Sequence, residues 1–453
     1  MGEFRVQGAR VVVIGAARSG LAAAELLVRR GAKVTLSDQK PSIEDAERMT
    51  RIGVNLSLGT NDSDALERAD LVVTSPGVPL ELPSLAAVRG RGVPVIGELE
   101  LASRWTRGPI VAITGTKGKS TTTTLVGRML TAAGKSVLVG GNIGVPLSAQ
   151  VESSTSSSIH VVEISSFQLE ATDTFHPWIA AILNFSPDHL DRHPDEAAYA
   201  AAKSRVFANQ TPDDWAVLNA DNVAAMTLGA STRAQRVAYA VDAIEHADVF
   251  VERDFIWQRT SEGSTPLVPL TAIRLAGRHM LSNVVAAAAI ARAAGAPGNA
   301  MTRAVDGFTG LEHVMEPVAT IGGVRFVNDS KATNVDAAGR SIESFDRVVA
   351  IIGGRYKGGS FADLAAPLGS RGRGVVAIGE ARPLVLSALE GVVPVVEAGS
   401  MREAVASAFD LARPDGVVLL APACSSFDMF SDYADRGRVF KAEVMRLRNV
   451  ERG

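Results

Sequence analysis

The sequence predicts an α/β protein built from three domains. Short β-branched apolar runs alternate with segments of helical periodicity along most of the chain, which is typical of sheets covered by helices. A glycine-rich stretch, GTKGKS, ends one such run and opens a helical segment. The length of 453 residues fits three domains of roughly 150 residues each. We expect a Rossmann-like N-terminal sheet at residues 1–107, a central P-loop ATPase-type α/β domain at 108–311 and a C-terminal Rossmann-like α/β domain at 312–453.

The composition is that of an ordinary globular chain, with 46% hydrophobic and 21% charged residues. A net charge of −3 gives no electrostatic reason to bind nucleic acid or an anionic membrane. The single cysteine, Cys424, excludes an internal disulfide framework and a metal site made only of cysteines. No apolar run approaches the ~18 residues that a membrane span needs. We therefore expect a cytoplasmic protein without nucleic-acid or membrane partners.

The first domain reads as a doubly wound α/β unit. RVVVIG is followed by a helix to Arg30, and KVTLSD, ADLVVTSPG and VPVIGELE read as further strands. The turn Gly15–Gly20 has alanine at position 17, where a dinucleotide fingerprint requires glycine, and this weakens an NAD interpretation. A plain nucleotide-shaped pocket remains, with an empty Rossmann-like scaffold as the alternative. The residues that we expect to line it are Arg18 and Ser19 for a phosphate, Asp38 for a ribose hydroxyl, and Ser75 and Gly77 in a tight turn at the same sheet edge.

The stretch from Pro109 to Thr124 predicts a strand, a phosphate loop and a helix. Loop amides and a helix N-terminus offer N–H groups to an anion, Lys119 can reach the β- and γ-phosphates, and the Ser120 hydroxyl can hold Mg²⁺. Ile113 stands where the usual spacing has glycine, so the loop is a compact variant. The alternative is a glycine-rich turn without chemical consequence. We expect a nucleoside triphosphate to bind Gly115, Thr116, Lys117, Gly118, Lys119, Ser120 and Thr121.

The central domain has further polar residues in or after its expected strands, and one lysine on a helix. Asn142 lies in the turn after KSVLVGG, and Glu163 lies inside a buried-type strand, where a nearby metal would be a partner and solvent exposure is the alternative. Asp188, His189, Asp191 and His193 crowd an expected helix start, where capping alone could explain the acids. Their place beside the phosphate loop makes His189 a candidate Mg²⁺ or substrate ligand. Lys203 stands among alanines on a helix, a position that is usually a solvated charge.

The third domain repeats the strand-then-turn pattern. VRFVNDSKATN ends a strand in a polar turn, and RVVAIIGGRYKGG, GVVAIG and GVVLLAPACSSFDMF follow it. Before this domain, the helix GRHMLSNVVAAAAIARAAG offers His279 and Asn283 in its first turns. Three sheets with polar turns at strand ends imply ligands that are held between domains.

These residues together resemble the Mur ligase family, and within it the D-glutamate-adding branch. The resemblance covers nearly the whole chain and is carried by GTKGKST, GGNIG, EISSFQLE, NFSPDHLDRH, AAKSRVF, NDSKATN, IIGGRYKGG and APACSSFDMF. EISSFQLE combined with NDSKATN looks like the D-glutamate-adding members rather than their L-alanine- or diamino-acid-adding relatives. The resemblance implies an ATP-dependent amide ligase that joins D-glutamate to UDP-N-acetylmuramoyl-L-alanine through an acyl phosphate in peptidoglycan precursor synthesis.

The family also implies residue roles and cofactors, which are ATP and two Mg²⁺ ions. Lys119, Lys203 and His189 would be catalytic, with Lys203 carbamylated by CO₂ so that it becomes an oxygen ligand. The metal ligands would be Ser120, Glu163, His189 and the Lys203 carbamate. Asn283, Asp329 and Lys331 would contact the nucleotide, and Asn142 the UDP-sugar. D-Glutamate would be bound by Thr333, Lys357, Ser426 and Tyr433.

Three positions depart from the family pattern. Lys117 stands where asparagine is common, Met280 where asparagine is often found, and Val314 where arginine is usual. The last two are ATP-contact positions in the family. Other Mur ligases or folylpolyglutamate synthetase would share the central domain, although the turn Gly15–Gly20 argues against a folate enzyme. A nucleotide-gated binding module or simple NTPase is the alternative from another class, and it would use the phosphate loop without the third domain.

Overall fold

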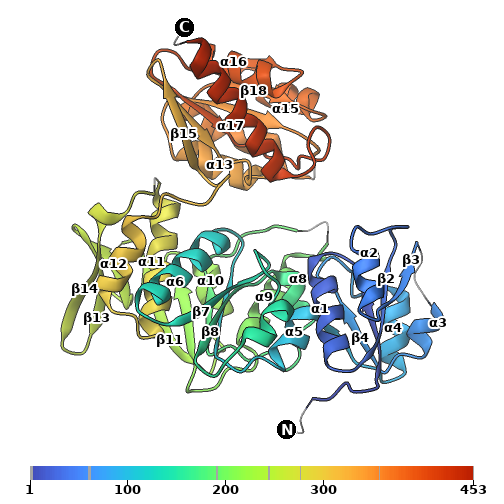
Figure 1. Ribbon diagram of the computed structural model, residues 1–453. Coiled ribbons are helices and arrows are strands. Elements are labelled where there is room, and N and C mark those ends of the chain that lie inside the picture. The colour runs from blue at the N-terminus through green and yellow to red at the C-terminus, as the bar shows by residue number, and fades with distance from the viewer. Residues whose placement is uncertain are drawn as a thin grey trace. The chain divides into compact units, whose positions relative to one another are not determined.

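The computed structural model describes residues 4–59, 63–189, 192–242, 245–275, 277–356 and 358–451. The chain divides into two compact units, residues 1–273 with 282–306 and residues 274–281 with 307–453. Within the described ranges the first unit holds two sheets and the second holds one (Figure 1). The predicted α/β class with three sheets is confirmed. The domain boundaries at 107/108 and 311/312 stay predictions.

The first sheet is parallel, in the order β3-β2-β1-β4-β5. Its strands are β1 (Arg10–Ile14), β2 (Lys33–Asp38), β3 (Asn55–Leu58), β4 (Leu71–Thr74) and β5 (Val95–Gly97). Its helices are α1 (Arg18–Arg29), α2 (Ala46–Arg51), α3 (Ser63–Glu67), α4 (Pro83–Gly90) and α5 (Glu98–Ser103). The strand order reverses between β1 and β4, and a crevice for ligands forms at such a switch point.

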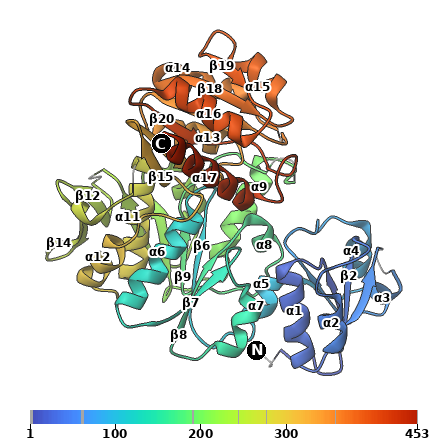
Figure 2. The ribbon, with the colours of Figure 1, turned by 45° about the horizontal axis from the view of Figure 1, so that its top comes forward.

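One sequence prediction in this sheet was wrong. VPVIGELE was interpreted as a single strand, but β5 ends at Gly97 and Glu98 begins α5. The α5 side chains Leu99 and Leu101 are fully buried. Periodicity over so few residues does not separate a buried strand from a buried helix. Figure 2 shows α5 beside α1 and α7 (Leu147–Gln150), at the junction of the first two sheets.

The second sheet has the order β14-β13-β12-β11-β10-β9-β6-β8-β7. Its strands are β6 (Ile110–Thr114), β7 (Ser136–Gly141), β8 (Ser158–Glu163), β9 (Ile179–Ile182), β10 (Trp215–Asn219), β11 (Gln235–Ala240), β12 (Val249–Glu252), β13 (Phe255–Thr260) and β14 (Gly263–Pro269). β12 to β14 pair antiparallel, and the other ladders are parallel. β6 lies between β8 and β9, so the loops after these three strands meet at one edge of the sheet.

Helices cover this second sheet. They are α6 (Lys119–Ala132), α7, α8 (Ser166–Glu170), α9 (Glu196–Ser204), α10 (Val223–Leu228), α11 (Arg278–Ala293) and α12 (Gly298–Asp306), with short 3₁₀ turns at Val151–Ser153, Arg205–Phe207 and Leu270–Ala272. The residues of α11 up to Leu281 are grouped with the second unit. All five residues of β6 are buried, which is what an apolar central strand of a parallel sheet predicts.

The third sheet has the order β15-β16-β20-β17-β18-β19, and only its β15–β16 ladder is antiparallel. Its strands are β15 (Glu316–Ile321), β16 (Val324–Asn328), β17 (Val348–Gly353), β18 (Gly372–Ile378), β19 (Val395–Glu397) and β20 (Val417–Leu420). Its helices are α13 (Val335–Glu343), α14 (Ala365–Arg371), α15 (Arg382–Leu389), α16 (Met401–Ala412) and α17 (Tyr433–Val450), with a 3₁₀ turn at Phe361–Leu364. Apolar clusters fill both faces of this sheet. In the described part of the chain, no helix is long and apolar enough to span a membrane.

Candidate active site

The phosphate-loop pattern forms the predicted strand, loop and helix. The loop leaves β6 at Gly115, whose φ is 149°, and reaches α6 through Gly118 in the left-handed region, with φ 81°. A Cβ atom at Gly118 would lie 2.1 Å from Oδ1 of Asn283, so only glycine fits there. The structure thus brings Asn283 of α11 against the loop. Ser120 and Thr121 lie in the first turn of α6 and are largely buried.

Two lysine amines converge on one carbonyl of this loop. Nζ of Lys119 donates to the Gly115 and Thr116 carbonyls at 3.0 and 2.9 Å, and Nζ of Lys203 donates to the Gly115 carbonyl at 3.0 Å. Lys203 is 1% exposed, so a solvated helix lysine is excluded. Burial, together with the nearby charge of Lys119, lowers the pKa of the Lys203 amine well below its ordinary value. The Tyr199 ring, 4.6 Å from this amine, closes the site from the side of α9.

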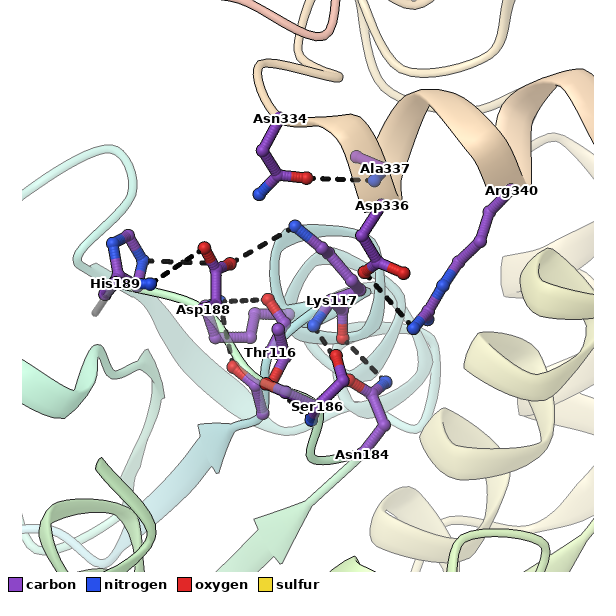
Figure 3. Close-up of polar contacts among 12 residues, drawn as sticks. Thr116, Lys117, Asn184, Ser186, Asp188, His189, Asn334, Asp336, Ala337 and Arg340 are labelled. Atoms are coloured by element: carbon purple, nitrogen blue, oxygen red, sulfur yellow. Dashed lines mark hydrogen bonds and ion pairs between the residues drawn. The ribbon is translucent and has the colours of Figure 1, made fainter. Parts of the chain in front are cut away.

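A second chain segment, after β9, is fastened to the phosphate loop (Figure 3). The Asn184 side chain accepts a hydrogen bond from N–H of Lys117 at 2.8 Å and donates one to its carbonyl at 3.0 Å. Thr116 Oγ1 donates to the Ser186 carbonyl at 3.1 Å and accepts from the Ser186 N–H at 3.1 Å. These paired bonds fix the loop backbone relative to residues 184–188. Neither Asn184 nor Tyr199 was singled out from the sequence. Their only sequence signal is position, since Asn184 follows the strand β9 and Tyr199 precedes Lys203 on α9.

The predicted helix start at the polar cluster was wrong. The helix begins at Glu196, with Asp195 as its cap, so Asp188, His189 and His193 lie in the loop before it, and Asp191 lies outside the described residues. The cluster therefore does not cap the helix. His189 adopts the left-handed conformation, with φ 58°, which is uncommon for a residue other than glycine, and its side chain is 48% exposed.

His193 is buried and anchors that loop. Its Nε2 lies 2.9 Å from Ser166 Oγ, its Nδ1 lies 3.0 Å from a Glu170 oxygen, and its ring stacks on Phe167. Burial is the main cause that lowers the pKa of His193. The neighbouring Arg192 donates to the Gly77 and Val78 carbonyls at 3.0 and 2.8 Å. The loop of His189 is thus tied to α8 and to the small-residue turn of the first sheet.

Glu163, at the end of β8, fits a metal ligand. The residue is 2% exposed, which excludes the alternative of a solvated carboxylate. One oxygen accepts a hydrogen bond from Asn142 Nδ2 at 2.9 Å, and the other, Oε2, has no hydrogen-bond partner among the described residues. A buried, unsatisfied carboxylate oxygen is costly, and a divalent cation would satisfy it. The described residues contain no group of three or more His, Cys, Asp or Glu side chains placed to hold a metal, so nucleotide oxygens and the Ser120 hydroxyl would have to complete the set.

The predicted sugar-nucleotide residues meet at the switch point of the first sheet. Ser75 Oγ donates to the Gly15 carbonyl at 2.7 Å. Both Asp38 oxygens accept backbone N–H groups, from Ala16 at 2.6 Å and Lys40 at 2.9 Å, so this carboxylate shapes the Gly15 turn. Arg18, on the exposed first turn of α1 beside Ser19, donates to the Gly144 carbonyl at 3.1 Å in the turn that carries Asn142.

The second unit collects a separate group of predicted residues at the ends of β16 and β20. Asp329 is 6% exposed and accepts hydrogen bonds from the Met315 N–H and the Ser341 hydroxyl. The turn continues through Lys331 to Thr333, whose N–H donates to the Lys331 carbonyl at 2.8 Å. Ser426, in the loop after β20, is 2% exposed, and Tyr433 at the start of α17 is 39% exposed. Lys357 lies outside the described residues.

A buried arginine, which sequence reasoning missed, joins the two loops of this group. Arg436 of α17 donates to the Ser330 hydroxyl at 3.0 Å, to the Ser330 carbonyl at 2.9 Å and to the Cys424 carbonyl at 3.1 Å. Burial lowers its pKa to about 10. A lone arginine in a helix gives no sequence signal of such a contact.

The departures at Met280 and Val314 belong to the apolar interior of the second unit. Met280 is 2% exposed, and Val314 packs against the same cluster. Met280 also lines a cavity of about 310 Å³, together with Arg274, Leu275 and residues of β15 and β16. No residue that we predicted to bind a ligand lines this cavity.

Comparisons with known proteins show the family to which the chain belongs. Three family models match: a Mur ligase MurD-like N-terminal domain at residues 9–97, a Mur ligase middle domain at 113–291 and a Mur ligase glutamate ligase domain at 315–424. The UDP-N-acetylmuramoylalanine--D-glutamate ligase of Acidobacterium capsulatum is 45% identical across 99% of this chain and 98% of its own length. The protein of the same name from Pelotomaculum thermopropionicum is 44% identical across 97% of this chain and 98% of its own length.

A solved structure shares the fold. A pseudomurein peptide ligase type C from Methanothermus fervidus aligns with a TM-score of 0.61 and 18% identity, over 97% of this chain and 100% of that one. Full-length identity above 40% and three consecutive domain matches leave one assignment: the chain belongs to the Mur ligase family.

Proposed function

We propose that this protein is an ATP-dependent ligase that joins D-glutamate to UDP-N-acetylmuramoyl-L-alanine in peptidoglycan precursor synthesis. The observation that carries this proposal is the full-length likeness to D-glutamate ligases, combined with a phosphate loop on which two lysines converge. The proposal includes the cytoplasm as the place of the reaction and a monomer as the working form.

The first step would join two anions, the alanine carboxylate and the γ-phosphate of ATP. The loop N–H groups and the N-terminus of α6 would bind the phosphates, and Lys119 would turn from its two carbonyl partners to the transferring group. Such preorganised positive charge is usually the largest catalytic contribution in reactions of this kind. The products of this step are an acyl phosphate and ADP. The D-glutamate amine would then attack the acyl carbon, and phosphate would leave.

Mg²⁺ would neutralise phosphate charge when bound. Glu163 Oε2 and the Ser120 hydroxyl would hold one ion, and His189 with a modified Lys203 would hold a second. The unsatisfied buried oxygen of Glu163 supports this assignment, because water cannot reach it.

The two substrates would bind at the two groups of residues described above. The crevice at Gly15, Ser75 and Gly77 would receive the sugar nucleotide, with Arg18, Ser19, Asp38 and Asn142 around it. In the second unit, Asp329 and Lys331 would meet the nucleotide, and Thr333, Lys357, Ser426 and Tyr433 would bind the carboxylates of D-glutamate.

Lys203 would carry a carbamate in the active protein. Burial and the neighbouring charge of Lys119, which shares its acceptor carbonyl, lower the pKa of the Lys203 amine and so favour its neutral form more than in an exposed lysine. That amine attacks CO₂ to form an N–C bond and releases one proton. The resulting carboxylate is longer than glutamate and supplies the oxygen ligand that Mg²⁺ prefers.

Substitution with chemical rescue tests the role of Lys203. Lys203→Ala should lose most activity and regain part of it when a short carboxylic acid is added, whereas Lys119→Ala should not be rescued. Bicarbonate should raise the activity of CO₂-depleted wild-type protein. Near-normal activity of Lys203→Ala without a bicarbonate response would exclude the carbamate.

The proposed reaction itself is tested by ADP release. Release should require both UDP-N-acetylmuramoyl-L-alanine and D-glutamate for full turnover, and Lys119→Ala should abolish it while the protein stays folded. ADP release that ignores both substrates would indicate a simple NTPase instead.

A further inference from the structure

The phosphate loop contains a second lysine whose ammonium has a partner outside the loop. Nζ of Lys117 lies 3.3 Å from Oδ2 of Asp188, and the two side chains are 22% and 18% exposed (Figure 3). The other Asp188 oxygen accepts the N–H of His189 at 3.0 Å. An ion pair therefore joins the phosphate loop to the residue that precedes His189.

This ion pair is not needed to hold the two segments together. The Asn184 side chain binds both the N–H and the carbonyl of Lys117, and Thr116 exchanges two hydrogen bonds with Ser186. All four bonds use the backbone of the loop or a neighbouring side chain, so they persist when the Lys117 side chain is changed. Partly exposed ion pairs also contribute little to stability. The role of the Lys117 charge therefore lies in the binding of a ligand to the phosphate loop.

The Lys117 ammonium lies beside a site that is built for an anion. Gly118 follows it directly and precedes α6, whose N-terminus attracts negative charge. Lys119 and Lys203 both point at the Gly115 carbonyl of the same loop. Asp188 would repel an incoming triphosphate, and the Lys117 ammonium that pairs with it reduces this repulsion.

We propose that Lys117 is a counter-ion that changes partner: it pairs with Asp188 in the nucleotide-free protein and with a triphosphate oxygen when ATP is bound. The inference rests on the proposed function, since the anion is the nucleotide of that reaction. When ATP binds, the Lys117 ammonium moves to the triphosphate, and Asp188, the residue before His189, no longer pairs with it. The binding of ATP is thereby coupled to the loop after β9 through a side chain, while the backbone contacts stay unchanged.

Equilibrium binding of magnesium-free ATP tests the exchange without catalysis and without metal. Lys117→Asn should raise the Kd about ten-fold, because a charge-assisted contact is lost and Asp188 is left unbalanced. Asp188→Asn should lower the Kd, because Lys117 is already free of its partner when ATP arrives. The double variant should lie between the two, and Lys117→Arg should bind within about two-fold of wild type, because it keeps the charge.

Two controls separate this inference from its rivals. Arg10→Asn breaks an ion pair with Asp70 on the first sheet, 2.7 Å long, and should leave the Kd unchanged. If the ion pair between Lys117 and Asp188 were only structural, Lys117→Asn and Asp188→Asn would raise the Kd for ATP to the same extent. Equal rises in Kd would overturn the proposed role of Lys117 without affecting the proposed function. An unchanged Kd in both variants, while Lys119→Ala loses affinity, would do the same. Wild-type protein that binds ATP only with Mg²⁺ would overturn the inference alone, and wild-type protein that binds ATP neither with nor without Mg²⁺ would overturn the proposed function as well.

Discussion

Glu100 of α5 makes a buried polar contact between the first two sheets, and its removal should destabilise the first unit. Its side chain is fully buried. One oxygen accepts the N–H groups of Asp173 and Phe175 at 2.8 and 2.9 Å, and the other accepts the Thr174 hydroxyl at 2.6 Å and Nε of Arg104 at 2.8 Å. Glu100→Ala would leave the buried Phe175 N–H without this acceptor and would remove the acceptor shared by three partly buried donors. Breaking a buried charged network of this kind costs about 3–5 kcal/mol.

The loss of stability can be measured as a decrease in the melting temperature, Tm. At roughly 2–4 °C per kcal/mol, Glu100→Ala should lower the Tm by about 6–20 °C. The matched control is Glu152→Ala, which removes an exposed ion pair between Arg30 and Glu152 at the same junction, 2.8 Å long. Because such exposed pairs are worth about 1 kcal/mol or less, the control should shift the Tm by only a few degrees. Equal shifts for the two variants would refute this reasoning.

The pH dependence of the Glu100 contribution has a definite sign. Burial alone would raise the pKa of Glu100, but the N–H of Asp173, the Thr174 hydroxyl and Arg104 together lower it below its ordinary value. A depressed pKa contributes stability that is present above the unfolded pKa, about 4.3, and is lost as the pH falls through the folded value. The difference in unfolding free energy between wild type and Glu100→Gln should therefore be constant near neutral pH and shrink below about pH 4. A difference that grows in acid would contradict the network.

Two further predictions concern a substrate contact and a buried imidazole. Lys357→Ala should raise the KM for D-glutamate by about one to two orders of magnitude with a smaller effect on ATP, since a charge-assisted hydrogen bond is lost; an unchanged KM in steady-state kinetics would place the site elsewhere. His160 is fully buried, and its ring nitrogens lie 2.8 Å from Ser154 Oγ and 3.2 Å from Gln150 Oε1. Burial lowers the pKa of this imidazole in the folded protein. The free energy of unfolding should therefore fall as the pH drops below about 6.5, because there the unfolded chain takes up a proton that the folded protein does not. Urea unfolding should show a flatter pH profile for His160→Gln, and identical profiles would count against a neutral, buried ring.

The sequence predicted those parts of the molecule that depend on local pattern. GTKGKS follows an apolar run, and the structure confirms the strand and the helix that begins at Lys119. Turns after strands could also be placed at sheet edges, because parallel strands present their carboxyl ends together.

Contacts between distant residues could not be predicted in this way. Glu100 meets residues 173–175, and Lys203 meets Gly115, only because the sheet order brings their segments together. The sequence alone therefore left Lys203 as an ordinary solvated helix lysine, and only the family resemblance pointed to its role. The extra ion pair of Lys117 depends on the loop after β9, and the helix that follows this loop begins only at Glu196, beyond the polar cluster where it was expected.

The choice of amino acid is the central claim, and phosphate release across a panel of amino acids tests it most directly. The full chain would be given UDP-N-acetylmuramoyl-L-alanine, ATP and Mg²⁺, with D-glutamate, L-glutamate, L-alanine, D-alanine or meso-diaminopimelate in separate reactions. We predict release with D-glutamate and little above background with the others, because two carboxylates and a D centre must be recognised together. Equal release with L-alanine or the diamino acid, or release that does not require the sugar nucleotide, would contradict the account.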